Sequence, residues 1–342
     1  MIELKNFSIK TATMEEWRDY HKVKQSYFME LFPDDDPVEL DTFMVSEKGW
    51  VSNDNCFNLT VLAYKFGKIA GLGALTKFSG HSQVNADIIV LPEYRKKGVG
   101  SELLKKLCEE AVSLGFRTLF FFTVDIIPSG ENFLMKNSAK KGIIQKGNQV
   151  LTQDLDEKLM RKWVKEGTNP KYESGVWLNK IPEEHLEKYS EAYNSINDAP
   201  HGDLENVTAE MTPDAMKDLV KGIVEGKNEI IIAWVRNKET GEFAAISDLF
   251  IYYTKKYAAF QNNTLTVPKY RGNGFGKLVK ALNALYLIDC RPNVRTIRTS
   301  NANVNEAMLA INEKMGFKQY QTHTFWELEV EKSLKKVQRG KI

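Results

Sequence analysis

A ten-residue pattern occurs twice in this chain, and the repetition restricts the folds open to it. The first copy reads LPEYRKKGVG over residues 91–100, and the second reads VPKYRGNGFG over residues 267–276. Proline, tyrosine, arginine and two glycines coincide when residue 267 is aligned with residue 91. The offset is close to half of the 342 residues. A repeat of this period predicts a duplicated domain and not one turn of a solenoid.

Similar sequence surrounds the two copies. Each copy follows a strand-like run and precedes apolar residues at helical spacing, and a further strand candidate follows that helix. These segments are residues 83–91, 99–114 and 117–124 in the first half, and residues 258–267, 275–286 and 294–299 in the second. We therefore expect an α/β fold in each half, with a glycine loop between a strand and a helix.

The segments upstream of the repeat differ between the halves. The first half is predicted to contain a strand at 7–13, a helix at 14–31 capped by Thr13, and a hairpin of 57–64 with 68–77. The second half is predicted to contain helices at 182–194 and 213–225 and strands at 229–236 and 242–252. The charged segment 156–175 has little strand pattern, and we expect the domain boundary there.

Composition excludes several classes of function. Lys and Arg number 47 against 45 Asp and Glu, and this balance lacks the basic excess typical of nucleic-acid-binding proteins. The three cysteines form no CxxC pair and the five histidines show no ligand spacing, so we expect neither a disulfide framework nor a metal site. The first ten residues lack the apolar segment of a secretion signal, and no apolar run could span a bilayer. We expect a cytoplasmic protein that binds neither nucleic acid nor membrane.

The spacing Arg-x-x-Gly-x-Gly between a strand and a helix suits phosphate binding. Glycines let the backbone turn sharply and approach a ligand closely. The free N–H groups of the first helical turn converge there with the positive end of the helix dipole. Arg95 or Arg271 would add a cation. Neither copy has the spacing of a Walker A loop or of the dinucleotide-binding fingerprint.

The repeated motif, [Val/Leu]-Pro-x-Tyr-Arg-x-x-Gly-x-Gly, resembles the acyl-CoA-binding motif of the GNAT acetyltransferase superfamily. In the second half, residues 299–308 and 311–317 resemble the superfamily's closing Asn-rich helix and its Gly-Phe strand entry. Residues 196–204 and the pair Arg291-Pro292 are similar to tandem-domain members, which include the mycothiol-synthase-like proteins. The resemblance is strong over about 176–330 and weaker over about 60–145.

The resemblance implies two tandem GNAT-like domains, each a mixed, splayed, mostly antiparallel sheet flanked by helices. It also implies an enzyme that transfers an acetyl group from acetyl-CoA to a primary amine, here expected to belong to a small molecule. Residues 1–156 would form an N-terminal domain that departs from the family pattern. Residues 176–332 would form the C-terminal domain, which we predict to be catalytic. We expect a monomer or a homodimer.

Carrying the motif over assigns acetyl-CoA contacts in both halves. In the second half these residues are Leu265, Thr266, Val267, Arg271, Gly272, Asn273, Gly274, Phe275, Gly276, Asn305 and Asn312. Their first-half equivalents are Val90, Leu91, Arg95, Lys96, Lys97, Gly98, Val99 and Gly100. Asn305 could equally cap the helix that begins there.

The position of the family's usual proton-donating tyrosine holds Asn312, and its first-half counterpart is Ser138. An amide cannot act as a general acid, so the resemblance leaves Tyr320, His323 or solvent to protonate the departing thiolate. This departure also favours an alternative function, a non-catalytic acyl-CoA-binding or sensing protein.

The general base is expected to be a carboxylate near the acceptor. Asp248 lies in a strand that should line the acceptor cleft, although an ordinary exposed strand carboxylate would look the same. Asp87 is the first-half candidate. Asp198, His201 and Asp203 lie in a loop that could receive a cationic amine or could be a solvated turn.

Overall fold

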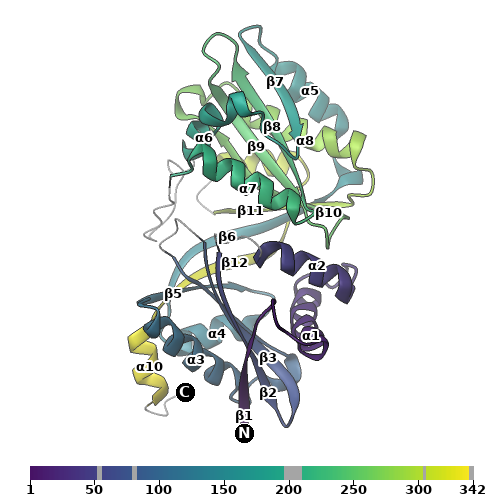
Figure 1. Cartoon of the computed structure of the whole chain (residues 1–342). Helices are drawn as coiled ribbons and strands as arrows, with labels where there is room; N and C mark the ends of the chain where they lie inside the picture. Colours follow the sequence, from purple (N-terminus) through teal and green to yellow (C-terminus); the bar gives the residue numbers. More distant parts are fainter. Residues whose placement is uncertain (52–55, 79–82, 196–209, 303–305, 339–342) are drawn as a thin grey trace. The chain divides into compact units, whose positions relative to one another are not determined.

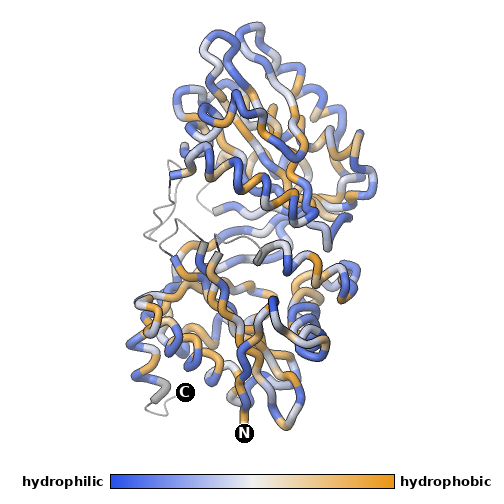
Figure 2. Tube along the Cα trace, viewed as in Figure 1, coloured by the Kyte–Doolittle hydropathy of each residue, from blue (hydrophilic) through white to orange (hydrophobic). Residues whose placement is uncertain are grey.

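The computed structural model describes residues 1–51, 56–78, 83–195, 210–302 and 306–338 (Figure 1). It divides into two units. Unit 1 contains Met1–Ile144 together with the described residues from Thr322 onward. Unit 2 contains the described residues from Gln145 to Gln321. In both units the hydrophobic residues concentrate along the strands and on parts of the helices (Figure 2).

The sheet of unit 1 has the order β1-β2-β3-β4-β5-β12. Its strands are β1 (Ile2–Phe7), β2 (Cys56–Lys65), β3 (Lys68–Phe78), β4 (Asn85–Val90), β5 (Thr118–Val124) and β12 (Lys318–Glu329). All neighbours are antiparallel except β4 and β5, which run parallel and pair at Asn85 and Phe120. Beyond that pair no residues of β4 and β5 are paired, so the two strands diverge and the sheet splays between them.

Helices cover both faces of the unit 1 sheet. They are α1 (Met14–Leu31), α2 (Leu40–Val51), α3 (Val99–Ser113), α4 (Pro128–Lys136) and α10 (Val330–Gln338). Alternate residues of a strand point to opposite faces. Leu72 and Ile89 pack with α1, whereas Ile88 and Val90 pack with α3. Helices α1 and α3 therefore lie on opposite faces of the sheet.

Unit 2 repeats this arrangement with the order β6-β11-β10-β9-β8-β7. Its strands are β6 (Lys140–Leu151), β7 (Tyr172–Leu178), β8 (Glu229–Asn237), β9 (Phe243–Ile251), β10 (Ala258–Thr266) and β11 (Thr296–Ala302). Its helices are α5 (Glu157–Gly167), α6 (Leu186–Asn194), α7 (Pro213–Glu225), α8 (Phe275–Cys290) and α9 (Glu306–Lys314). The parallel strands β10 and β11 pair up to Gln261 and Thr299, and β10 has a bulge between Gln261 and Thr264. The two units confirm the expected tandem, splayed, mostly antiparallel sheets.

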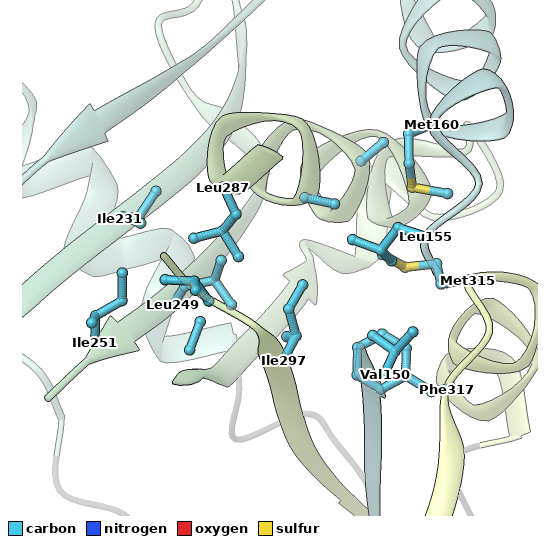
Figure 3. Close-up of a cluster of buried hydrophobic side chains, with 14 of the residues drawn as sticks. Val150, Leu155, Met160, Ile231, Leu249, Ile251, Leu287, Ile297, Met315 and Phe317 are labelled. Atoms are coloured by element: carbon cyan, nitrogen blue, oxygen red, sulfur yellow. The ribbon is translucent and has the colours of Figure 1, made fainter. Parts of the chain in front are cut away.

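The sixth strand of each sheet comes from the other half of the sequence. Strand β6 carries the chain into unit 2, where its last residues pair with β11 and Val150 packs beside Phe317 in the core (Figure 3). Strand β12 returns the chain to unit 1, where it pairs with β5 and buries Trp326 and Leu328. The units therefore differ from the contiguous domains 1–156 and 176–332 expected from the sequence.

Several local predictions are confirmed. The helix at 14–31 begins after Thr13, whose side chain forms a capping box with Glu16. The expected hairpin is β2 and β3, joined at Phe66 and Gly67, which both have positive φ.

The strand predicted at 7–13 is wrong. Strand β1 ends at Phe7, and the next residues form a turn in which the Thr11 and Ala12 N–H groups donate to the Ser8 carbonyl. The segment 156–175 is not a bare linker either. It contains α5 and the start of β7, and Met160 and Trp163 of α5 are buried in the core of unit 2.

Candidate functional site

The two glycine loops adopt the same backbone conformation. The third residue before each helix has a left-handed φ, at Lys96 (58°) and Gly272 (84°). The residue directly before each helix has one too, at Gly98 (87°) and Gly274 (77°). The first N–H groups of α3 and α8 have no acceptor within their helices. Both loops therefore present a row of amides that can bind an anion.

Both loop arginines donate hydrogen bonds to backbone carbonyls of the preceding strand. Arg95 Nε donates to the Val90 carbonyl at 3.1 Å, and its Nη2 forms an ion pair with Glu30 Oε1 at 2.6 Å. Arg271 Nε donates to the Thr266 carbonyl at 3.4 Å. Each guanidinium thus ties its loop to the end of the preceding strand, and the anion-binding capacity rests mainly on the main-chain amides.

A cavity of about 570 Å³ lies in unit 1, where β4 and β5 diverge. It is lined by the end of α1, by β4, by the glycine loop and the first turn of α3, by β5 and by α4. Its lining residues include Tyr27, Asp87, Lys96, Gly98, Gly100, Ser101, Phe122 and Lys136. Because α1 and α3 lie on opposite faces of the sheet, a cavity lined by both passes through the sheet at the splay.

The two faces of this cavity differ in charge. At the start of α3 it meets the glycine-loop amides, and its lining also includes Lys96, Lys136 and Arg95, the last of which pairs with Glu30. On the α1 face it meets Asp87, which shares the strand face of Ile89, and Tyr27. Burial, with the nearby Asp87 and Glu30 carboxylates, raises the pKa of Tyr27 to about 12. One face therefore suits an anionic group and the other a cationic group.

In unit 2 a hydrogen-bonded polar cluster lies where the pairing of β10 with β11 ends, at Gln261. Gln261 Nε2 donates to Ser247 Oγ at 2.9 Å and to the Asp248 carbonyl at 2.8 Å. The Asp248 carboxylate accepts a hydrogen bond from the Asn263 N–H at 2.6 Å and another from Asn262 at 3.2 Å. Desolvation raises the pKa of Asp248 to about 6, and these hydrogen bonds oppose the rise. Asp248 is 5% exposed, so it is not the exposed strand carboxylate of the alternative interpretation.

Lys280 and Asn283 of α8 complete this cluster. Lys280 is 1% exposed, and its Nζ lies 3.5 Å from Gln261 Oε1. Asn283 is fully buried and donates to the Ser247 carbonyl at 3.1 Å. The aligned positions in α3, Leu104 and Leu107, are fully buried leucines. The same helix face is thus apolar in unit 1 and polar in unit 2.

Replacing Lys280 by Met is expected to change how stability depends on pH. Desolvation lowers the pKa of Lys280 to about 7 in the folded protein, below the 10.5 expected when unfolded. Between these values the unfolded chain binds more protons, so the wild-type free energy of unfolding should rise with pH by up to about 1.4 kcal/mol per unit. Below pH 7 the buried Lys280 is protonated in the folded protein as well, so the full free-energy cost of burying its charge is present. Denaturant unfolding from pH 6 to 10 should show this rise in the wild type and lose it in Lys280→Met; equal slopes would contradict the assignment.

The remaining predicted residues fall in several places. Leu265 and Val267 pack against the core under α6 and α7, and Thr266 Oγ1 would lie 3.4 Å from a Cβ at Gly276. Asn312 is buried and donates to Asn301 Oδ1 at 2.6 Å. Tyr320 is partly buried in β12. Asn305, Asp198, His201 and Asp203 lie outside the described residues.

His323 belongs to unit 1, although its position in the sequence suggested the second domain. It pairs with Val124 of β5, and its ring lies 4.9 Å from that of Phe122. Desolvation lowers the pKa of His323 to about 4. Sequence reasoning missed Tyr27 and Phe122, because neither belongs to a motif and only the folded sheet brings them to the cavity.

Comparison with known proteins agrees with this fold. Residues 15–126 match the sequence profile of the Acetyltransferase (GNAT) family. A tandem GNAT protein from the clavulanic acid biosynthesis pathway has a similar structure, with a TM-score of 0.78 and 19% identity over 96% of this chain and 99% of that one. Among curated proteins, none matches this sequence.

Two further solved structures share the fold over the same extent. A GCN5-related N-acetyltransferase from Sphaerobacter thermophilus has a TM-score of 0.65 and 11% identity, covering 96% of each chain. A GNAT-family acetyltransferase from Colwellia psychrerythraea has a TM-score of 0.56 and 14% identity, covering 96% of this chain and 100% of that one. The chain therefore has the fold of tandem GNAT proteins, and residues 15–126 match the profile of the GNAT acetyltransferase family.

Neither a membrane span nor a metal site is evident among the described residues. No helix in this part of the chain combines the length and apolar character needed to cross a membrane. Over the same residues, no group of His, Cys, Asp or Glu side chains is arranged to hold a metal ion.

Proposed function

We propose that this protein is an acyl-CoA-dependent acetyltransferase that acts on a primary amine of a small molecule in the unit 1 cavity. The observation that carries the proposal is the cavity that crosses the splayed sheet, with amides on one face and a carboxylate on the other. Such a cavity lets two ligands of opposite charge meet inside the protein.

The α3 face has the chemistry needed for coenzyme A. The amides at Gly98–Ser101 would hold the diphosphate, and Lys96 and Lys136 would add positive charge. The edge of β4 beyond Asn85 has no strand partner in β5, so its backbone groups, apart from the Val90 carbonyl that accepts from Arg95, are available to the pantetheine amides. When bound, acetyl-CoA would supply an acetyl group activated as a thioester.

The α1 face has the chemistry needed for the acceptor. Asp87 lies there within the same cavity and could take a proton from an incoming ammonium, which frees the nitrogen lone pair for attack. The positions of the family's usual acid are engaged elsewhere: Ser138 Oγ accepts from Lys336 at 2.9 Å, and Asn312 donates to Asn301. Proton return to the thiolate would then rely on solvent in the cavity.

The glycine loop of the second half has the same backbone conformation as that of the first half. The catalytic role expected for the second half therefore stays a prediction, and so does the mycothiol-synthase-like arrangement. The buried cluster at its splay favours a binding or structural role for unit 2 over catalysis.

Release of free thiol from acetyl-CoA, followed with a panel of amines, tests the function. Binding without thiol release from any amine would favour the acyl-CoA sensor instead.

Asp87→Asn is expected to lower kcat/KM by about 100-fold, because removing a general base typically costs 10²–10⁴-fold. The amide keeps the size of the side chain, so acetyl-CoA affinity should stay unchanged. Asp41→Asn, at an exposed carboxylate of α2 in the same unit, is the control. Asp248→Asn is the competing variant, and a larger loss of thiol release from it than from Asp87→Asn would place the base in unit 2.

A further inference from the structure

The acceptor face of the unit 1 cavity has a second component besides Asp87. Residues of β5 alternate between the two faces: Leu119 and Phe121 pack with α3, so Phe122 and Val124 lie on the α1 face. Phe122 lines the cavity and is 37% exposed. An aromatic ring therefore borders the cavity on the same face as Asp87.

The neighbours of Phe122 make this wall apolar and uncharged. Its ring lies edge-on to Phe325 at 5.4 Å and to His323 at 4.9 Å between centroids. His323 is 9% exposed, and desolvation holds its pKa at about 4, so it is neutral near pH 7. The wall can bind an apolar body, and its ring face can attract an ammonium.

Asp87 is the single carboxylate among the described residues that line the cavity. The nearby acids on the helices are engaged: Glu30 pairs with Arg95 at 2.6 Å, and Glu47 accepts a hydrogen bond from Tyr20 at 2.7 Å. One carboxylate matches one ammonium, and a polycation would leave its other charges facing apolar side chains.

Tyr27 adds a polar group beside Asp87. Tyr20 and Tyr64, the neighbouring phenols, donate to Glu47 and Asp19, whereas Tyr27 borders the cavity itself. A phenol oxygen that faces the cavity can accept a second hydrogen bond from an ammonium held by Asp87.

We propose that the acceptor is a monocationic primary amine with an apolar or aromatic body, whose ammonium meets Asp87 and Tyr27 while its body packs on Phe122. This inference rests on the proposed function and names its substrate class. It predicts preference for an arylalkyl amine over polyamines and amino sugars.

The test compares 2-phenylethylamine, spermidine and glucosamine as acceptors, with thiol release from acetyl-CoA as the readout. The wild type should use 2-phenylethylamine at least about 100-fold more efficiently than the other two, the scale of burying an aromatic body. Phe122→Ala should raise KM for 2-phenylethylamine about 10-fold and leave KM for acetyl-CoA unchanged. Phe57→Ala is the matched control, because Phe57 is also 37% exposed in unit 1 and lies outside the cavity lining.

The outcomes separate the inference from the function on which it rests. Preference for spermidine or glucosamine, or an unchanged KM in Phe122→Ala, would overturn the inference and leave an acetyltransferase. Equal effects of Phe122→Ala and Phe57→Ala would also overturn it. No thiol release with any amine would overturn the proposed function itself.

Discussion

Gly98→Glu is expected to abolish acetyl-CoA binding and turnover. Gly98 precedes α3 with a φ of 87°, and its amide belongs to the group that would hold the diphosphate. A carboxylate there would repel the phosphates and disturb the amides, each of which can contribute about 1.5–3 kcal/mol to a charged ligand. The loss of two such contacts corresponds to at least about 100-fold in affinity, measurable by calorimetric titration with acetyl-CoA.

Gly274→Glu is the matched variant, because the backbone strain it introduces is similar. Gly274 precedes α8 with a φ of 77°, and a Cβ added at either glycine would meet no backbone atom within 4 Å. We expect Gly274→Glu to retain most of the turnover, and Gly98→Asn, whose side chain tolerates left-handed φ, to retain binding. If Gly274→Glu abolished turnover and Gly98→Glu did not, the reaction would be assigned to the second half, as the sequence motifs predicted.

Trp326→Ala is expected to destabilise unit 1, although Trp326 lies near the end of the sequence. Its side chain is 1% exposed in the unit 1 core, and its Nε1 donates to Thr123 Oγ1 at 2.8 Å. Removing a buried tryptophan costs about 3–5 kcal/mol, a large part of the 5–15 kcal/mol that stabilises a typical domain. Acetyl-CoA affinity and the free energy of unfolding should both fall.

Trp163→Ala is the comparison, because Trp163 is equally a buried tryptophan but belongs to the core of unit 2. We expect it to destabilise unit 2 while acetyl-CoA binding at the unit 1 cavity persists. Trp326→Phe, which keeps most of the ring, should cost less than Trp326→Ala. If Trp163→Ala reduced acetyl-CoA affinity as much as Trp326→Ala does, the loss of affinity could not be attributed to the packing of β12 in unit 1.

Features set by neighbouring residues were predictable from the sequence. The capping box of Thr13 and Glu16 depends on a spacing of three residues, and the Phe66-Gly67 turn depends on two adjacent residues. The loops ending at Gly98 and Gly274 also follow from local backbone freedom. The strand predicted at 7–13 failed because a short turn and a strand share similar composition at that length.

The partners of the last strands could not be read from the sequence. Strands β6 and β12 have ordinary strand patterns, and nothing local tells which sheet each will complete. The choice depends on long-range burial, in which Val150 completes one core and Trp326 the other. The boundary expected at 156–175 missed α5 for a different reason. Leu159, Met160, Trp163 and Val164 recur at helical spacing, a local signal that the charged composition of the segment obscured.

Two similar domains, each with a glycine loop before a helix, were predictable from the amino-acid sequence, because the repeat and the short motif can be recognised without knowing the fold. The three-dimensional fold was needed to show that Asp87, Tyr27 and Phe122 share one cavity, and that Lys280 is buried beside Gln261. These relations join residues that are distant in the sequence. They are fixed by which face of a sheet each strand presents and by which helix packs on that face.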